Sequence, residues 1–361
     1  MTLDDFLREW NSPSKTLVVH TSGSTGRPKP LEVQKSRMKA SALQTCQFLG
    51  LGKSDTALLC IPLDYIAGKM VVVRSIACGM RLINVEPSSH PLSGLKEIPT
   101  FAAMVPLQVY SSIQVKEELD ILRKIRHLII GGGAIDKGLE TILHGFPNAV
   151  WSTYGMTETL SHIALRRISG EDATDYYTPF DNITVSQNEN GCICIDAPKI
   201  CNSILHTNDI AEFHPDGRRF RIIGRKDNVI NSGGIKIHIE EMENRLAPYM
   251  NHEFAITKKE DKKLGEKVVM IVAMPDFFPG NLESNSFCIK KPDTLHYENN
   301  QLSERLADIN KYILTNLPRY WQPREIYIVS SIPHTDTGKL ARGRIAEIIS
   351  DFNKESIQKL E

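Results

Sequence analysis

Between residues 17 and 153, short apolar segments typical of β-strands alternate with segments that have the apolar spacing of a helix. The expected strands are 17–19, 56–61, 81–85, 100–105, 127–130 and 149–153, and the expected helices are 33–50, 67–79, 106–113 and 137–144. Strands that are separated by helices pair in parallel, because each helix returns the chain to the same end of the sheet. The alternation therefore predicts an α/β fold with a largely parallel sheet.

The second half of the chain has a different pattern. From about residue 183 short β segments with turns prevail, and after them we expect a helix at 240–246, a strand at 266–274, a helix at 304–316 and a strand at 325–329. Residues 275–303 contain Pro, Asn and Ser with few apolar pairs, so we expect a long irregular excursion there. The pattern predicts a β-rich subdomain followed by a smaller α+β domain.

Residues 20–29 read His-Thr-Ser-Gly-Ser-Thr-Gly-Arg-Pro-Lys and directly follow the first expected strand. Glycines let backbone N–H groups converge on an anion, hydroxyls add donors, and Arg27 and Lys29 supply positive charge. The stretch is not a Walker A loop, because only two residues separate its glycines and prolines 28 and 30 oppose an immediate helix. It is typical of a phosphate-binding loop between two strands, with a flexible surface loop as the alternative.

Two further polar segments follow expected strands, and parallel α/β sheets bind ligands at the carboxyl ends of their strands. Gly131-Gly-Gly-Ala134 would let a flat ring lie against bare backbone, with a tight turn as the alternative. Tyr154-Gly-Met-Thr-Glu-Thr159 offers an aromatic face, hydroxyls and a carboxylate that could hold Mg²⁺, with a helix N-terminus as the alternative.

Two single residues complete the set of candidates. Asp209 lies between expected β segments, and its carboxylate suits a sugar diol or an ordinary turn. Lys339 lies in a Gly-containing loop near the end of the chain, where a lone exposed lysine would indicate nothing by itself.

Taken together and in this order, the motifs resemble those of the adenylate-forming acyl-CoA ligase superfamily, which includes nonribosomal-peptide adenylation domains and luciferases. The matching segments are 21–29, Gly132–Ala134, Tyr154–Glu158, Asp209, Gly224–Asp227, Ile230–Gly234, Glu240 and Pro333–Lys339. The resemblance implies a two-step reaction. A carboxylate attacks the α-phosphate of Mg·ATP to give an acyl-adenylate and pyrophosphate, and the thiol of CoA then displaces AMP.

The resemblance also implies roles for individual residues. Lys339, Thr157 and Glu158 would be catalytic, with Glu158 as the Mg²⁺ ligand and Lys339 bridging the carboxylate and the α-phosphate. The residues that would bind ATP or AMP are Thr21, Ser22, Gly23, Ser24, Thr25, Gly26, Lys29, Gly132, Gly133, Ala134, Tyr154, Gly155, Met156, Asp209 and Arg225. Ser232, Gly233 and Gly234 would line a channel for CoA, with a plain hairpin turn as the alternative explanation of these glycines.

The same resemblance implies two domains. Residues 1–225 would form the core domain that binds ATP and the acid, and residues 226–361 a mobile domain that carries the catalytic lysine and turns about Asp227. The phosphate loop begins much earlier in this chain than in most of the superfamily, so the usual N-terminal subdomain would be truncated. This compact form is most similar to short o-succinylbenzoate–CoA ligases of menaquinone biosynthesis.

A dicarboxylic aromatic acid would need cations for its second carboxylate. Tyr65, Lys69, Arg74 and His162 are the tentative residues of an acyl pocket. Tyr65 lies in the 62–68 loop, Lys69 and Arg74 lie in the expected helix after that loop, and His162 follows the Thr-Glu motif. The alternatives are that Lys69 and Arg74 are solvated helix residues and that His162 is a satisfied polar group at the end of a strand.

The amino-acid composition limits the kinds of molecule that the protein is expected to bind. Lys+Arg and Asp+Glu both total 43, so no net charge favours nucleic acid or an anionic membrane. The seven cysteines are scattered and odd in number, which we interpret as reduced thiols in the cytoplasm, and no segment is apolar over the length of a bilayer. The expected partners are small molecules: a carboxylic acid, ATP and CoA.

Three alternatives to an o-succinylbenzoate–CoA ligase stay open. The enzyme could act on another aryl or short acyl acid, or it could be a stand-alone adenylation domain that loads a carrier protein. The third is an inactive nucleotide-binding module, against which Lys339, Glu158 and Asp209 argue.

Overall fold

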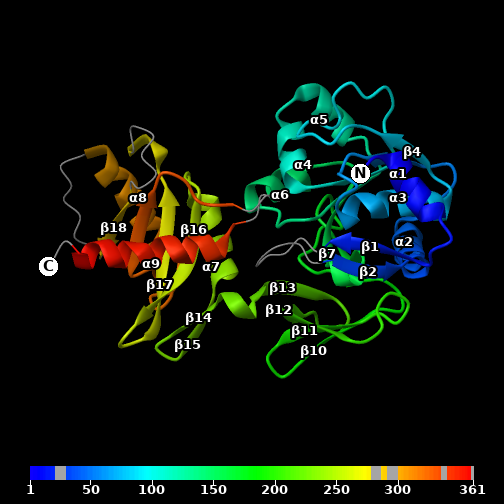
Figure 1. Cartoon of the computed structure of the whole chain (residues 1–361). Helices are drawn as coiled ribbons and strands as arrows, with labels where there is room; N and C mark the ends of the chain where they lie inside the picture. Colours follow the sequence, from blue (N-terminus) through cyan, green and yellow to red (C-terminus); the bar gives the residue numbers. More distant parts are fainter. Residues whose placement is uncertain (21–29, 278–285, 291–299, 335–339, 359–361) are drawn as a thin grey trace. The chain divides into compact units, whose positions relative to one another are not determined.

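The computed structural model describes residues 1–20, 30–277, 286–290, 300–334 and 340–358, and Figure 1 traces the chain through them. The chain divides into two compact units. Unit 1 comprises Met1–Ile135, Leu139–Thr207 and Ala211–Ile222, and unit 2 comprises Asp136–Gly138, Asn208–Ile210 and Ile223–Glu361. The functional domain boundary between residues 225 and 226 stays a prediction.

The main sheet of unit 1 has seven strands in the order β4-β3-β5-β6-β7-β8-β9. The strands are β3 (Thr56–Leu59), β4 (Arg81–Asn84), β5 (Phe101–Met104), β6 (His127–Ile130), β7 (Ala149–Gly155), β8 (His162–Arg167) and β9 (Thr178–Pro179). β3 to β7 pair in parallel, and β8 and β9 add antiparallel strands at one edge. The predicted largely parallel α/β sheet is therefore confirmed.

The helices of this half of the chain are α1 (Leu3–Asn11), α2 (Lys35–Leu49), α3 (Ile66–Cys78), α4 (Pro106–Ile113), α5 (Lys116–Leu122) and α6 (Lys137–His144). A capping box on Thr2 begins α1, and glycines in the left-handed conformation end α2 and α3. The helices α2, α3, α4 and α6 were expected from the apolar spacing, and α5 was not. α5 escaped prediction because it has only seven residues and follows α4 almost directly.

A separate two-stranded sheet frames the expected phosphate loop. β1 (Thr16–His20) pairs antiparallel with β2 (Pro30–Gln34), and the register places His20 opposite Pro30. The two ends of the 21–29 segment therefore lie side by side, as a strand–loop–strand arrangement requires. The segment itself lies outside the described residues.

A four-stranded sheet follows, in the order β10-β11-β12-β13. Its strands are β10 (Thr184–Gln187), β11 (Cys192–Asp196), β12 (Leu205–Phe213) and β13 (Phe220–Arg225). Asp209 lies within β12, so the expectation that it lies in a connection between β segments is wrong. Most β12 side chains are only partly buried or exposed, so this strand lacks the apolar alternation by which strands are found in a sequence.

Unit 2 contains a six-stranded sheet in the order β15-β14-β17-β19-β18, with β16 paired to β17. Its strands are β14 (Val229–Ser232), β15 (Ile235–His238), β16 (Phe254–Asp261), β17 (Gly265–Ala273), β18 (Ser286–Lys290) and β19 (Glu325–Val329), and its helices are α7 (Ile239–Leu246), α8 (Asn300–Asn316) and α9 (Arg342–Gln358). Two apolar clusters cover the sheet, one with residues of α7 and α8 and one with residues of α9. β18 contradicts the expected irregular excursion over 275–303, because it adds an antiparallel strand to β19.

Candidate active site

Two of the predicted motifs leave neighbouring strands at the same edge of the main sheet. β6 and β7 pair in parallel, so Gly131–Ala134 and the Tyr154 motif emerge together. A Cβ atom on Gly131 would lie 2.3 Å from Thr153 Oγ1, and Gly132 has a φ of +81°. Both positions therefore need glycine for reasons of backbone geometry.

The Tyr154 motif begins inside β7 and not after it, because Tyr154 and Gly155 still belong to the strand. The Tyr154 ring packs at 5.2 Å from the Phe220 ring, nearly edge to face. A Cβ atom on Gly155 would lie 2.4 Å from the Ser161 carbonyl oxygen, so the chain after the motif folds back tightly onto this glycine.

A short 3₁₀ turn, η1 (Thr157–Thr159), presents Thr157 and Glu158. Buried Thr159 holds this turn, because its Oγ1 accepts a hydrogen bond from Met156 N at 2.9 Å. Leu160 then adopts a φ of +64°, a conformation that costs a residue with a side chain roughly 1–3 kcal/mol. Thr157 and Glu158 are thus displayed by a strained, tightly held turn.

The Glu158 carboxylate fits the role predicted for it. The side chain is exposed, and it makes no hydrogen bond or ion pair with any residue that the structure describes. Mg²⁺ in nucleotide sites is typically held by one or two carboxylates together with phosphate oxygens and water. Among the described residues no three His, Cys, Asp or Glu side chains gather closely enough to hold a metal alone.

Arg74 is one of the largest fully buried side chains of the chain, with 2% of its surface exposed. Its guanidinium donates to Ser161 Oγ, and within the described residues it forms no ion pair with a carboxylate. Burial lowers the pKa of Arg74 to about 10. The alternative that Arg74 is a solvated helix residue is therefore wrong, and the cation lies unneutralised inside unit 1.

His162 begins β8 and is buried beside Arg74. Its Nδ1 lies 3.2 Å from Ser161 Oγ and its Nε2 lies 3.1 Å from Thr45 Oγ1. Burial, and after it the charge of Arg74, lower the pKa of His162 well below its usual range. The imidazole is therefore neutral at physiological pH, and both of its nitrogens have partners.

The remaining two tentative residues of the acyl pocket lie at the start of the same helix. Lys69 is buried, with Nζ 5.4 Å above the centre of the Phe6 ring, and burial lowers its pKa. It is not a solvated helix residue either. Tyr65 immediately precedes α3 and is 43% exposed. Arg74 and His162 thus share one hydrogen-bonded group, which Lys69 and Tyr65 do not join.

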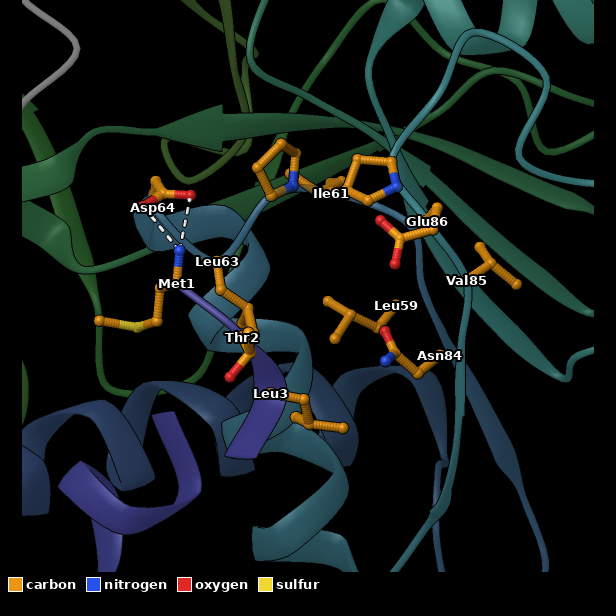
Figure 2. Close-up of a pocket in the computed structure, with 12 residues that line it drawn as sticks. Met1, Thr2, Leu3, Leu59, Ile61, Leu63, Asp64, Asn84, Val85 and Glu86 are labelled. Carbon is orange, nitrogen blue, oxygen red and sulfur yellow. Dashed lines mark hydrogen bonds and ion pairs between the residues drawn. The ribbon is translucent and has the colours of Figure 1, made fainter. Parts of the chain in front are cut away.

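A pocket of about 310 Å³ lies at the carboxyl ends of β3 and β4, next to the start of α1 (Figure 2). It is lined by Met1, Thr2, Leu3, Leu59, Ile61, Pro62, Leu63, Asp64, Asn84, Val85, Glu86 and Pro87. The amino group of Met1 lies 3.2 Å from Asp64 Oδ1. None of the predicted site residues lines this pocket, and the carboxylates of Asp64 and Glu86 make it a poor host for a second acidic group.

In unit 2, three predicted residues meet. Arg225 Nη1 lies 2.9 Å from Asp209 Oδ1, and Arg225 Nη2 lies 3.4 Å from Asp227 Oδ2. Asn208 also donates to Asp227, at 3.0 Å. Asp227 lies in the 3₁₀ turn η2 (Lys226–Asn228), which joins β13 to β14.

The segment Ser232–Gly234 closes the hairpin between β14 and β15. Gly233 and Gly234 have φ values of +58° and +85°, as a two-residue turn with glycines requires. The hairpin alternative therefore describes the backbone, and contact with CoA stays a prediction.

The remaining predicted residues are Lys339 and those of the 21–29 loop, which lie outside the part of the chain that the structure describes. The sequence assigned no role to Thr45 or Ser161, and it indicated Thr159 only as one of the hydroxyls of the Tyr154 motif. All three support the predicted site residues by hydrogen bonds. A single threonine or serine carries no local signal of such a role. No described helix has the length and apolar character needed to cross a membrane.

Comparison with known proteins places the chain in a class. The family model described as AMP-binding enzyme matches residues 7–194, which is more than half of the chain. The protein therefore belongs to the AMP-binding enzyme family.

Individual relatives narrow the comparison. The chain is similar to a 2-succinylbenzoate–CoA ligase from Listeria innocua, with 24% identity over 375 residues that cover 95% of this chain and 72% of the relative. It is also similar to the crystal structure of an acyl-CoA synthetase (AMP-forming)/AMP-acid ligase II-like protein from Dyadobacter fermentans. That likeness has 32% identity and a TM-score of 0.60, over 95% of this chain and 93% of the other.

A third likeness concerns the fold. The o-succinylbenzoate CoA synthetase (MenE) from Bacillus subtilis, solved with the acyl-adenylate intermediate OSB-AMP, has a TM-score of 0.69 and 20% identity. The matched region covers 91% of this chain and 68% of that one.

Proposed function

We propose that this protein is an ATP-dependent carboxylate–CoA ligase that works through an acyl-adenylate, and that its acid is 2-succinylbenzoate. The reaction converts the acid, ATP and CoA into acyl-CoA, AMP and pyrophosphate. Membership of the AMP-binding enzyme family and the names of the relatives support the class of reaction. We choose 2-succinylbenzoate as the acid because the guanidinium of Arg74 is buried.

The charge of Arg74 argues for an anionic ligand. A buried cation without a carboxylate partner is costly, and a bound anion reduces that cost. Arg74 Nε is fully buried and makes no hydrogen bond with any residue that the structure describes, so a carboxylate that reached it would satisfy this donor. 2-Succinylbenzoate has two carboxylates, of which one can react with ATP while the other pairs with this guanidinium. Lys69 lies five residues earlier in α3 and adds positive charge to the same helix.

The proposed first step joins two anions, so the protein must mainly position them and neutralise charge. The 21–29 loop would hold the β- and γ-phosphates, Thr157 the α-phosphate, and Glu158 a magnesium ion, which neutralises phosphate charge when bound. Gly132–Ala134 and Tyr154 would hold the adenine. Lys339 would bridge the attacking carboxylate and the α-phosphate, as a point cation on a flexible side chain can.

The ribose and the second step involve unit 2. Asp209 and Arg225 would bind the ribose hydroxyls, and their ion pair is consistent with a shared task. We propose Asp227 as the hinge about which the C-terminal domain turns between the half-reactions. Ser232, Gly233 and Gly234 would then line the path of the CoA thiol, because a hairpin without side chains leaves room for a thin arm.

We also propose a cytoplasmic location. The six cysteines whose side chains the structure describes are all free thiols, and free thiols persist in reducing compartments. ATP and CoA, the partners of the proposed reaction, are cytoplasmic substrates.

A pyrophosphate-release assay over a panel of acids tests the proposal. We expect release with 2-succinylbenzoate and Mg·ATP, followed by its CoA thioester when CoA is added. Benzoate and 4-oxo-4-phenylbutanoate are controls that each lack one of the two carboxylates of 2-succinylbenzoate, and they should be poor substrates. Turnover of a different acid, with none of 2-succinylbenzoate, would refute the substrate and retain the class.

The Arg74→Lys variant tests the observation on which the choice of acid depends. It keeps the charge but loses the planar set of donors, so we expect a KM for 2-succinylbenzoate that rises at least about tenfold, with the KM for ATP nearly unchanged. An equal rise in both values would show that Arg74 does not select the acid.

A further inference from the structure

Four side chains, three from α2, α3 and β8 and one from the residue just before β8, form a continuous series of hydrogen bonds inside unit 1. Arg74 of α3 donates to Ser161 Oγ, which lies 3.2 Å from His162 Nδ1. His162 Nε2 lies 3.1 Å from Thr45 Oγ1 of α2. Arg74, His162 and Thr45 are all buried.

The chemistry of the groups favours one direction for the protons along these hydrogen bonds. Thr45 Oγ1 donates to the Ser41 carbonyl oxygen at 3.4 Å, so it accepts from His162 Nε2–H. His162 Nδ1 is then an acceptor, and Ser161 must donate to it. The same Ser161 oxygen accepts from Arg74, because a guanidinium can only donate. Arg74 therefore donates to Ser161 Oγ, which donates to His162 Nδ1. On the other side of the ring, His162 Nε2–H donates to Thr45 Oγ1, which donates to the Ser41 carbonyl oxygen.

The serine at the centre of this chain is fixed by its backbone as well. Ser161 follows Leu160, whose φ is +64°, and Ser161 N donates to the Thr159 carbonyl oxygen at 2.7 Å. The Ser161 carbonyl oxygen lies 2.7 Å from Thr159 Oγ1. Ser161 is therefore anchored to the same strained turn that presents Thr157 and Glu158.

We propose that Ser161, His162 and Thr45 are positioning residues that hold the Arg74 guanidinium in one orientation, with its Nε free to meet the second carboxylate of the acid. This inference rests on the proposed function for the identity of the ligand. It adds that the neutral His162 imidazole, protonated on Nε2, determines which group donates and which accepts in each of these hydrogen bonds.

The chain matters because a guanidinium without fixed partners has several orientations. Preorganised donors bind an anion without a reorganisation cost at the moment of binding. In the protein, Thr45 accepts the Nε2 proton, and this acceptance keeps Nδ1 available to the Ser161 hydroxyl. Without the Thr45 hydroxyl, no acceptor favours the tautomer that carries its proton on Nε2. Ser161 then loses its fixed acceptor, and the Arg74 guanidinium loses its fixed orientation.

The first experiment reads the tautomer directly and needs no substrate. Nitrogen NMR on the full chain with ¹⁵N-labelled histidine, with His162→Gln used to assign the signal, should show a neutral ring with the proton on Nε2 at pH 7. In Thr45→Val the signal should shift toward the Nδ1–H form or a mixture. A protonated ring, or an Nδ1–H form in the unmodified protein, would overturn the inference.

The second experiment measures the acid. Thr45→Val should raise the KM for 2-succinylbenzoate about tenfold, as expected for one buried hydrogen bond, with the KM for ATP within about twofold. Thr45→Ser keeps the hydroxyl and should restore the KM. Ser169→Ala is a matched control, because Ser169 is also buried but forms its hydrogen bonds with Val150 N and Asn148 O and not with the four side chains of the proposal.

The two experiments fail in different ways. If no acid yields pyrophosphate with the unmodified protein, the proposed function fails. The NMR spectra still show whether His162 carries its proton on Nε2, as the proposed order of hydrogen bonds requires. If 2-succinylbenzoate is a good substrate but Thr45→Val leaves its KM unchanged, the positioning role is refuted and the proposed function stands. Equal effects of Thr45→Val and Ser169→Ala would also refute it, because both would then reflect general destabilisation.

Discussion

Arg342 and Glu243 face each other in a two-point ion pair, with Nη1 3.2 Å from Oε1 and Nη2 2.6 Å from Oε2. Glu243 belongs to α7 and Arg342 is the first residue of α9. The pair also bonds both backbone groups of Ile256, because Ile256 N donates to Glu243 and Arg342 donates to the Ile256 carbonyl oxygen. Two helices and β16 are thereby joined at one point of unit 2.

Removal of Arg342 should therefore destabilise unit 2. Arg342→Ala leaves the Glu243 carboxylate largely buried without its partner, and we expect a loss of about 2–3 kcal/mol of unfolding free energy. Urea unfolding followed by Trp321 fluorescence measures it. Lys258→Ala breaks a more exposed pair with Glu266 and should cost less than about 1 kcal/mol. Equal losses in the two variants would contradict the central place of the Arg342 pair.

Acid should weaken the fold through Glu325. Burial raises the pKa of this carboxyl, but hydrogen bonds from Lys267, Tyr327 and Lys259 outweigh burial and hold the pKa at about 2. Because the folded pKa lies below the ordinary value of 4.5, the stabilisation is complete above that value and is lost as the pH falls toward 2.

Urea unfolding of the unmodified protein and of Glu325→Gln at several pH values tests this linkage. The stability difference between the two should be largest near pH 7 and should shrink between pH 5 and about 3. Parallel stability curves over this range would show that Glu325 does not titrate as the lysines require.

Gly155 should tolerate no side chain. In Gly155→Ala the added carbon would lie within 3 Å of three backbone atoms of Ser161 and His162, so the turn that presents Glu158 must shift. We expect a loss of about 1–3 kcal/mol in stability and a loss of pyrophosphate release. Gly343→Ala is the matched control, because nothing lies within 4 Å of its added carbon and its helix should gain up to about 1 kcal/mol. Similar melting temperatures for both variants would contradict the close approach at Gly155.

The two half-reactions should separate in Lys339→Ala. The lysine is proposed to act on the α-phosphate, so adenylation should fall by orders of magnitude while thioester formation from a preformed acyl-adenylate stays nearly unchanged. Single-turnover measurements of each step provide the comparison. Lys311→Ala removes an exposed lysine of α8 and should change neither step. Equal losses in both steps would refute the assignment of Lys339 to the first one.

The sequence predicted those elements whose apolar residues lie between clear breaks. β6, α4, α6 and β19 begin and end where expected, because proline, glycine or polar residues bound their apolar runs. β12 and β18 were not predicted as strands. The partly exposed β12 lacks strand periodicity, and β18 is a short segment within a stretch rich in Pro, Asn and Ser.

The motifs could be predicted from the sequence because each is contiguous, but their support could not. His162 and Thr45 are 117 residues apart, and the contact exists only because the fold brings the start of β8 beside one residue of α2. A buried Arg74 and an exposed one look the same in a sequence, so the main argument for an anionic ligand became visible only in the fold.

The pairing of His20 with Pro30 has a thermodynamic consequence for the phosphate binding that we propose for residues 21–29. Bringing together the ends of a nine-residue segment such as 21–29 costs roughly 2 kcal/mol of chain entropy. The β1–β2 hairpin brings these ends together when the protein folds, so this chain entropy is lost during folding and not when a nucleotide binds. Nucleotide affinity and hairpin stability should therefore change together in variants of the hairpin, even when the variant residue never touches ATP.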